Sequence, residues 1–230
     1  MKKTILLLFL FTVSLALAQQ NMPVVMHYIT VKSSDAEKLI SLEKAYFSKI
    51  HKQNLDAGKK IGWDMWRLEN QEDIAHTTFL YIHLEPSLET MDMGNNPTTL
   101  FSESELARVR EQLSSLVVGS KVIMTSFKGG FAPIKEQPVN VVQLGYMDVD
   151  LLNFFEYEQM ELNNFMPAHK KNPLLRGWAL HSIDTPHAED EDDYLVANFF
   201  ESMNDMYKNS GVATQLSKQE KANYRNILKL

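Results

Sequence analysis

The sequence contains no cysteine in its 230 residues, and this absence excludes two classes of exported protein. A small scaffold stapled by disulfides needs several cysteines, and a bacterial lipoprotein needs one at its cleavage site. The chain also lacks an excess of positive charge, because 23 Lys and Arg stand against 29 Asp and Glu. Binding to nucleic acid through phosphates requires a clustered basic surface, so nucleic acid is not an expected partner.

Several catalytic motifs are missing as well. The chain has no G-x-S-x-G, no P-loop and no dinucleotide fingerprint, which removes the usual support for a hydrolase, a kinase or a dehydrogenase. Its histidines never occur as H-x-x-x-H and there is no cysteine ligand, so no metal site is expected. What the chain does have is 44% hydrophobic residues, enough to build a core without disulfides.

The N-terminus has the pattern of a secretory signal peptide. Two lysines, Lys2 and Lys3, precede an apolar run from Ile5 to Leu15, and Ala16-Leu17-Ala18 forms an A-x-A cleavage site. The run is shorter than the roughly 20 residues that a spanning helix needs, which argues against a membrane anchor. We therefore expect residues 1–18 to be removed after Ala18, leaving a periplasmic or secreted protein, not a lipoprotein, with no membrane segment.

The remaining chain contains an internal repeat. At a shift of about 118 positions Tyr28 matches Tyr146, Glu43 matches Glu161 and His51 matches His169; a shift of about 115 then pairs Gly62-Trp63 with Gly177-Trp178. The pattern predicts a first repeat over 24–128, a linker over 129–138 and a second repeat over 139–230.

Each repeat reads as strand, helix, two strands, helix and strand. In the first repeat, alternation and β-branched residues predict strands over 24–31, 61–68, 77–84 and 121–127, with helices over about 33–54 and 102–116. In the second repeat, strands are expected over 140–147, 175–183 and 194–200. The second repeat offers no fourth strand before Leu230, so this strand is missing or supplied from elsewhere.

This β-α-β-β-α-β order is that of the ferredoxin-like unit, and with the repeat length it resembles the tandem form of the dimeric α/β-barrel superfamily. The resemblance implies an α+β fold with two ferredoxin-like repeats, their antiparallel sheets packed face to face into a barrel-like core and their helices outside. Members of that superfamily include cofactor-free monooxygenases of the antibiotic-biosynthesis type, haem-handling enzymes and proteins of unknown role. The fold by itself does not select among these functions.

The duplicated first helix carries an acid and an imidazole on a largely apolar face. Glu43 and His51, like Glu161 and His169, are about 12 Å apart along one helix, too far to form a local pair. One interpretation directs the glutamates into pockets and the histidines toward a ligand or a haem iron. The other has the glutamates bonded to backbone or strand groups and the histidines capping the helix C-terminus as cations.

Strand alternation suggests where a ligand cavity would lie. We expect Ile29, Val31, Leu80, Ile82 and Leu84 under the helices, and Tyr28, Thr30, Phe79, Tyr81 and His83 on the other face. Trp63 and Trp66 have opposite parity, so one of them faces the barrel interior or water. Such an aromatic set with polar groups suits either a ligand cavity or a filled small barrel. The candidate ligand-binding residues are Tyr28, Glu43, His51, Trp66, Tyr81, His83, Tyr146, Glu161, His169 and Tyr194.

Three functions remain open from the sequence. The first is a non-catalytic exported protein that binds a small apolar or aromatic ligand in a barrel-like cavity. The second is a monooxygenase-like enzyme, cofactor-free or using haem, which the resemblance implies although the sequence requires no cofactor. The third is a structural or interaction module with a filled core. No residue is assigned a catalytic role, and no oligomeric state is predicted.

Overall fold

Two compact units make up the chain in a computed structural model, which describes residues 22–69, 73–92, 99–132, 138–185, 192–209 and 217–227. The first unit is Met22–Thr125, and the second begins at Ser126. The predicted signal peptide lies outside the described residues. No helix among those residues is long and apolar enough to cross a membrane.

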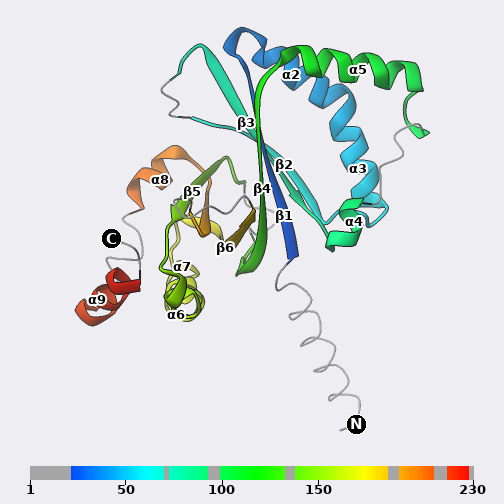
Figure 1. Cartoon of the computed structure of the whole chain (residues 1–230). Coiled ribbons are helices and arrows are strands. Elements are labelled where there is room, and N and C mark those ends of the chain that lie inside the picture. Colours follow the sequence, from blue (N-terminus) through cyan, green and yellow to red (C-terminus); the bar gives the residue numbers. More distant parts are fainter. Residues whose placement is uncertain are drawn as a thin grey trace, which may run out of the picture. The chain divides into compact units, whose positions relative to one another are not determined.

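The first unit places its helices on one face of a sheet with strand order β2-β3-β1-β4 (Figure 1). Its core brings Ala36 and Leu39 of the first helix against Ile29, Phe79 and Tyr81 of the strands. The strands are β1 (Met22–Lys32), β2 (Gly62–Arg67), β3 (His76–Leu84) and β4 (Val117–Phe131). The helices are η1 (Ser33–Asp35), α2 (Ala36–Leu42), η2 (Glu43–Phe47), α3 (Ser48–Asp56), α4 (Leu88–Asp92) and α5 (Glu103–Leu116).

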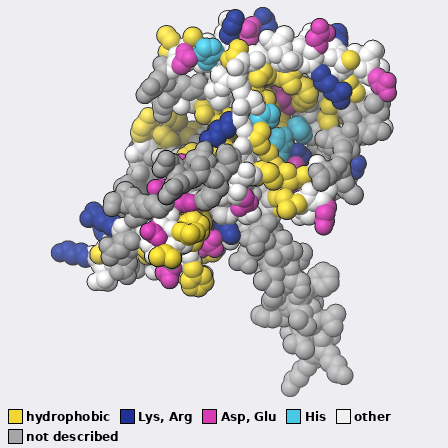
Figure 2. All heavy atoms as spheres, in the orientation of Figure 1, with side chains coloured by type: hydrophobic (Ala, Val, Ile, Leu, Met, Phe, Trp, Pro, Cys, Tyr) yellow, Lys and Arg dark blue, Asp and Glu magenta, His cyan; other side chains and the backbone are white. Residues whose placement is uncertain are grey.

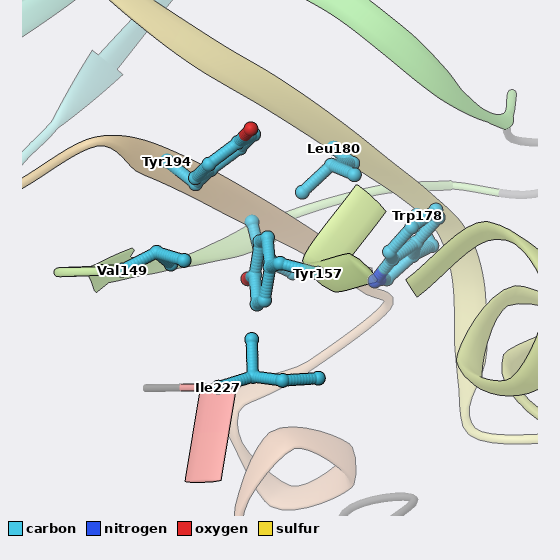
Figure 3. Packing of buried hydrophobic residues seen from close by; sticks show 7 residues of the cluster. Val149, Tyr157, Trp178, Leu180, Tyr194 and Ile227 are labelled. Atoms are coloured by element: carbon cyan, nitrogen blue, oxygen red, sulfur yellow. The ribbon is translucent and has the colours of Figure 1, made fainter. Parts of the chain in front are cut away.

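The second unit contains the end of β4 and three further strands, in the order β4-β6-β7-β5. Tyr157 lies in the middle of its core, with Ile227 of the last helix on one side and Tyr194 on the other (Figure 3). The strands are β5 (Val141–Met147), β6 (Leu175–Thr185) and β7 (Tyr194–Phe200). The helices are η4 (Leu151–Asn153), α6 (Phe154–Met160), η5 (Glu161–Phe165), α7 (Met166–His169), α8 (Met203–Lys208) and α9 (Lys218–Ile227).

Corresponding elements of the two units begin and end at matching positions. The 3-10 turns η1 and η4, the helices α2 and α6 and the π-helical turns η2 and η5 are each displaced by about 118 residues. Strand register agrees too, because Tyr28 lies opposite Leu80 and Tyr146 lies opposite Leu195. The predicted α+β class is confirmed, and the paired strands β1–β3, β2–β3, β5–β7 and β6–β7 are antiparallel.

One sequence expectation is corrected at β4. The strand begins directly after α5 and continues through Phe131, so Gly129 and Gly130 are strand residues and not the start of a linker. The remainder of the predicted linker includes residues 133–137, which lie outside the described chain. In the second unit β4 lies next to β6, at the opposite side of the sheet from β5. It therefore does not take the place of the fourth strand, which in the first unit lies next to β1.

Candidate functional site

A buried carboxyl group lies between the first helix and the sheet of the first unit. Glu43 begins the π-helical turn η2, and its side chain is directed at β3, where it accepts a hydrogen bond from the Tyr81 hydroxyl. Only 4% of Glu43 is exposed, and its Oε1 has no hydrogen-bond partner within the described part of the chain. Turns of this π type occur frequently at functional sites.

Burial controls the ionisation of this pair. It raises the pKa of Glu43 to about 7, against the smaller opposing effect of the Tyr81 hydrogen bond. The pKa of Tyr81 is also raised, first by burial and then by the neighbouring carboxylate. Glu43 can therefore take up or release a proton near neutral pH, while Tyr81 keeps its proton and acts as a donor.

Two histidines and a tryptophan of the first unit lie close to one another, on α3, β2 and β3. The imidazole of His51, from α3, stacks on the indole of Trp63, with ring centroids 4.7 Å apart and an interplanar angle of 20°. The ring of His83, from β3, is 5.2 Å away from that of His51. Burial, followed by the positive charge of Lys60, lowers the pKa of His51 to about 4 and that of His83 to about 3. Both rings are therefore neutral at pH 7.

A lysine contacts one of these histidines and also forms an ion pair. Lys60 Nζ lies 2.8 Å from His83 Nδ1 and 3.0 Å from Glu85 Oε1. Both members of the ion pair are largely buried, with side-chain exposures of 8% for Lys60 and 10% for Glu85. The β2–β3 pairing brings them together, because Gly62 lies opposite Leu84 at the end of the ladder.

The polar groups continue across the sheet to β1 and β4. His27 lies opposite Tyr81 in the β1–β3 ladder, with the two ring centroids 6.3 Å apart. Its Nε2 is 2.8 Å from the hydroxyl of Ser120 on β4, and burial lowers the pKa of His27. Figure 2 shows a group of histidine side chains at the visible surface, beside hydrophobic side chains. We call the set that crosses the sheet the polar belt: Ser120, His27, Tyr81, His83, Trp63 and Lys60.

An apolar cavity of about 210 Å³ opens next to His51. Phe47 and Ile50 line it from the first helix, and Leu106 and Val109 line it from α5. The polar side chains that line it are those of His51, Tyr46 and Arg110. The cavity is small beside common ligand pockets, so it suits a small, mostly apolar molecule or one part of a larger one.

The second unit repeats the packing of this site but only some of its polar groups. His169 stacks on Trp178 with ring centroids 5.4 Å apart and an interplanar angle of 21°, and burial lowers its pKa to about 4. Glu161 is buried like Glu43. At the positions that match His27, Tyr81, His83 and Glu85, however, the sequence has Gly145, Val196, Asn198 and Phe200. In this unit the Tyr194 hydroxyl instead donates a hydrogen bond of 3.0 Å to Glu158 Oε1.

Four of the ten predicted residues make contacts in pairs in the first unit: Glu43 with Tyr81, and His51 with His83. The strand-face prediction that grouped Tyr28 with Tyr81 is wrong. Tyr28 and Trp66 both lie opposite Leu80 and therefore face the other side of the sheet. In the second unit Tyr146 pairs with Leu195 and so does not share a face with Tyr194. Glu161, His169 and Tyr194 belong to the core region of that unit.

The helix-cap interpretation of the histidines is also corrected. Both imidazoles are partly or fully buried against indoles and neutral at pH 7, so neither acts as a cationic cap. Sequence reasoning missed His27, Lys60, Trp63 and Glu85 as site residues. The sequence contained a signal for two of them, because His27 and Glu85 are ionisable whereas the matching residues Gly145 and Phe200 are not.

A haem does not fit the cavity beside His51, which is only about 210 Å³. His83 Nδ1 is occupied by Lys60. No group of three or more His, Asp or Glu side chains among the described residues is placed to hold a metal ion.

Comparison with known proteins relates the chain to others by fold alone. No family model matches the sequence, and no curated protein matches it. A candidate monooxygenase from Lactobacillus acidophilus NCFM superimposes with a TM-score of 0.59 and 11% identity, covering 91% of this chain and 90% of its own. One from Fusobacterium nucleatum gives 0.59 and 12%, covering 91% and 88%. An anthrone oxidase-like protein gives 0.50 and 13%, covering 93% and 89%.

Proposed function

The chain has the fold of the dimeric α/β-barrel (ferredoxin-like) superfamily, and we propose that its first unit is the site of a cofactor-free, monooxygenase-like enzyme. Its substrate would be a small aromatic molecule with an activated methylene group, and Glu43 would be the general base. The observation that carries this proposal is the buried Glu43 carboxyl, with one oxygen bonded to Tyr81 and the other without a partner among the described residues.

The protonation behaviour of Glu43 suits proton abstraction. A general base works best when its pKa is near the operating pH, and burial raises the pKa of Glu43 to about 7. Tyr81 supports the carboxylate by donating a hydrogen bond to it. The apolar cavity beside His51 suits the aromatic body of such a substrate.

The proposed reaction is balanced without an external reductant. Glu43 removes one methylene proton, which leaves the electron pair on the substrate as an enolate-type anion. Dioxygen then oxidises that carbon: the methylene becomes a carbonyl, one oxygen atom enters the product and the other leaves as water. One substrate and one dioxygen thus yield one ketone and one water, and the substrate supplies all the electrons.

Oxygen uptake with anthrone as the probe tests this reaction. We expect the protein to convert anthrone to anthraquinone with one dioxygen consumed per molecule, and the rate to rise with pH around 7 as Glu43 ionises. Glu43→Gln should lower kcat by about 10²- to 10⁴-fold. Glu37→Gln, on the exposed side of α2, is the matched control and should keep the wild-type rate. A Glu43→Gln variant as fast as wild type would overturn the proposal.

Ligand binding without catalysis is the second candidate, favoured by the cavity beside His51. In that case anthrone would bind and quench tryptophan fluorescence, because Trp63 is stacked on the cavity-lining His51. Binding without oxygen uptake would select this function over the enzyme. Absence of both would favour the structural or interaction module.

We also propose that the chain is exported and that it arose by duplication of a ferredoxin-like unit. The matching turns, helices and registers support duplication, and the Lys2-Lys3 start and A-x-A site support export. N-terminal sequencing of the protein from the periplasm or medium should begin at Gln19.

We propose in addition that the sheets of the two units pack face to face. Pairs of engineered cysteines labelled for distance measurements would test it, and the chain has no native cysteine to interfere.

A further inference from the structure

The strand β5 forms an edge of the sheet in the second unit. It has β7 on one side, and no strand of the described residues lies on its other side. Its counterpart in the first unit, β1, lies between β3 and β4. An edge strand presents a row of backbone N–H and C=O groups, and such a row can pair with a strand of another chain.

The sequence of β5 does not oppose such pairing. Proteins usually protect an edge strand with a charged side chain or a proline. β5 has the sequence VVQLGYM and contains neither. The strand at the other end of the sheet order, β2, carries Asp64 and Arg67. Of these two edges, the β5 edge is therefore the one suited to association through strands.

Exposed apolar side chains lie at both ends of β5. The turn η4 and the start of α6 follow the end of the strand closely. At its beginning Val141 pairs with Phe200, and the helix α8, which follows β7, contacts β5 (Figure 1). The α6 patch comprises Leu151, Leu152 and Phe155, and the α8 patch comprises Met203 and Tyr207.

The α6 patch is not needed for the packing of the unit. The first repeat has Ser33, Ser34 and Glu37 at the matching positions, and the same helix still packs on its sheet there. All three side chains of the patch are largely exposed. Contiguous exposed apolar side chains mark interaction sites on soluble proteins. The patch therefore points to a contact with another molecule.

We propose that a second copy of this chain occupies the β5 edge, by antiparallel pairing of the two β5 strands about a two-fold axis at Leu144. Because paired antiparallel strands run in opposite directions, the α8 patch of each copy meets the α6 patch of the other. A two-fold interface must be self-complementary, and two apolar patches at opposite ends of one edge strand meet this condition. The inference goes beyond the proposed function and is independent of the chemistry of the first unit.

Pairing about Leu144 places compatible side chains opposite each other. Val142 lies opposite the partner's Tyr146, and a β-branched residue opposite an aromatic one is a favourable cross-strand pair. Just beyond the strand, Asn140 lies opposite the partner's Asp148, so no like charges meet. The interface therefore requires neither a buried charge nor a change in the strand.

Disulfide cross-linking tests this register. The chain has no cysteine, so Leu144→Cys can form a disulfide only with a second copy. Directly opposite Cα atoms of an antiparallel pair are about 4.5 to 5.5 Å apart, within reach of a disulfide. On mild oxidation Leu144→Cys should form a covalent dimer at least about tenfold faster than Asp64→Cys on the β2 edge, because pairing raises the effective concentration. Equal rates would overturn the proposal.

Sedimentation velocity tests the patches without changing β5. Wild type should shift from monomer to dimer as its concentration rises. Leu152→Ser and Phe155→Glu, which introduce the residues of the first repeat, should each raise the dimer Kd by about tenfold or more.

The matched control removes an exposed apolar side chain elsewhere. Ile74→Ser, at a position of the first unit that is 91% exposed, should keep the wild-type Kd. A wild type that stays monomeric at its highest soluble concentration would contradict the inference. So would a dimer that Leu152→Ser leaves intact, or one that Ile74→Ser weakens equally.

Discussion

The imidazole of His51 and the indole of Trp63 lie nearly parallel, with an interplanar angle of 20° between two rings from different elements of the first unit. His169 and Trp178 repeat the arrangement in the second unit. In each pair the indole removes water from one face of the imidazole, which makes protonation of the ring unfavourable. These pairs therefore act first as packing elements, and the acid stability of the protein depends on them.

Acid should destabilise the protein through its buried histidines. The folded-state pKa of His169 is lowered to about 4, from 6.5 for an ordinary histidine. Between these values the unfolded chain binds a proton that the folded chain does not, so stability falls as the pH falls from 6.5 to 4. His169→Phe should reduce this loss by roughly 3 kcal/mol. Urea denaturation at several pH values measures it, and an unchanged slope would contradict a buried neutral His169.

Glu43 should have the opposite pH dependence. Its folded-state pKa is raised to about 7, from the ordinary 4.5. Between those values the unfolded chain loses its proton first, so the free energy of unfolding falls as the pH rises from 4.5 to 7. Glu43→Gln cannot ionise, and above pH 7 it should be more stable than wild type by about 3 kcal/mol. The two proteins should converge below pH 4.5, and a constant difference across the range would argue against this pKa.

Gly130 should tolerate no side chain. A Cβ at this position would collide with the backbone carbonyl of Trp178 and lie 3.0 Å from the Cα of Ala179, both on β6. Backbone atoms cannot move aside as a side chain can, so Gly130→Ala should lower stability by about 3 kcal/mol. Gly119→Ala, earlier on the same strand, is the control, because its Cβ would meet the Thr30 side chain at ordinary contact distances of 3.6 and 3.8 Å. Thermal denaturation should separate the two variants clearly.

An exposed apolar patch at the start of α6 should contribute nothing to folding. Leu151, Leu152 and Phe155 are 72%, 87% and 70% exposed. The matching positions of the first repeat are Ser33, Ser34 and Glu37. Replacing the three residues by their polar counterparts should change stability by less than about 0.5 kcal/mol each. Equal denaturation midpoints with greater solubility would agree with this, whereas a large loss would show that the patch is covered in the folded protein.

The helices and strands could be predicted closely because their signals are local. Alternation over Thr77–Leu84 and the helical spacing of Glu43, Phe47 and His51 each depend on a few neighbouring residues. The predicted internal repeat added long-range information, since it put a glutamate and a histidine at matching positions, and the structure has the glutamate buried and the histidine stacked in both units. Strand ends were less certain: β4 starts at Val117, several residues before the predicted start, because it follows α5 without a loop.

The faces of the sheet could not be predicted in the same way. Alternation shows that Tyr81 and His83 share a face, and that Tyr28 and Thr30 share a face, but not how the two strands pair. A shift of one residue in register reverses the answer. The observed pairing of Tyr28 with Leu80 separates Tyr28 from the site, and it brings His27 beside Tyr81 instead.

By itself the sequence determined the class of fold, the order of its elements and the positions of Glu43, His51, Tyr81 and His83, because each of these follows from spacing along the chain. Tertiary structure alone decided that the first unit holds the polar belt and that Lys60 contacts His83 and Glu85. It also decided that Glu43 has a pKa near 7. Burial and pairing between distant strands set those properties, and neither is encoded in any short stretch of residues.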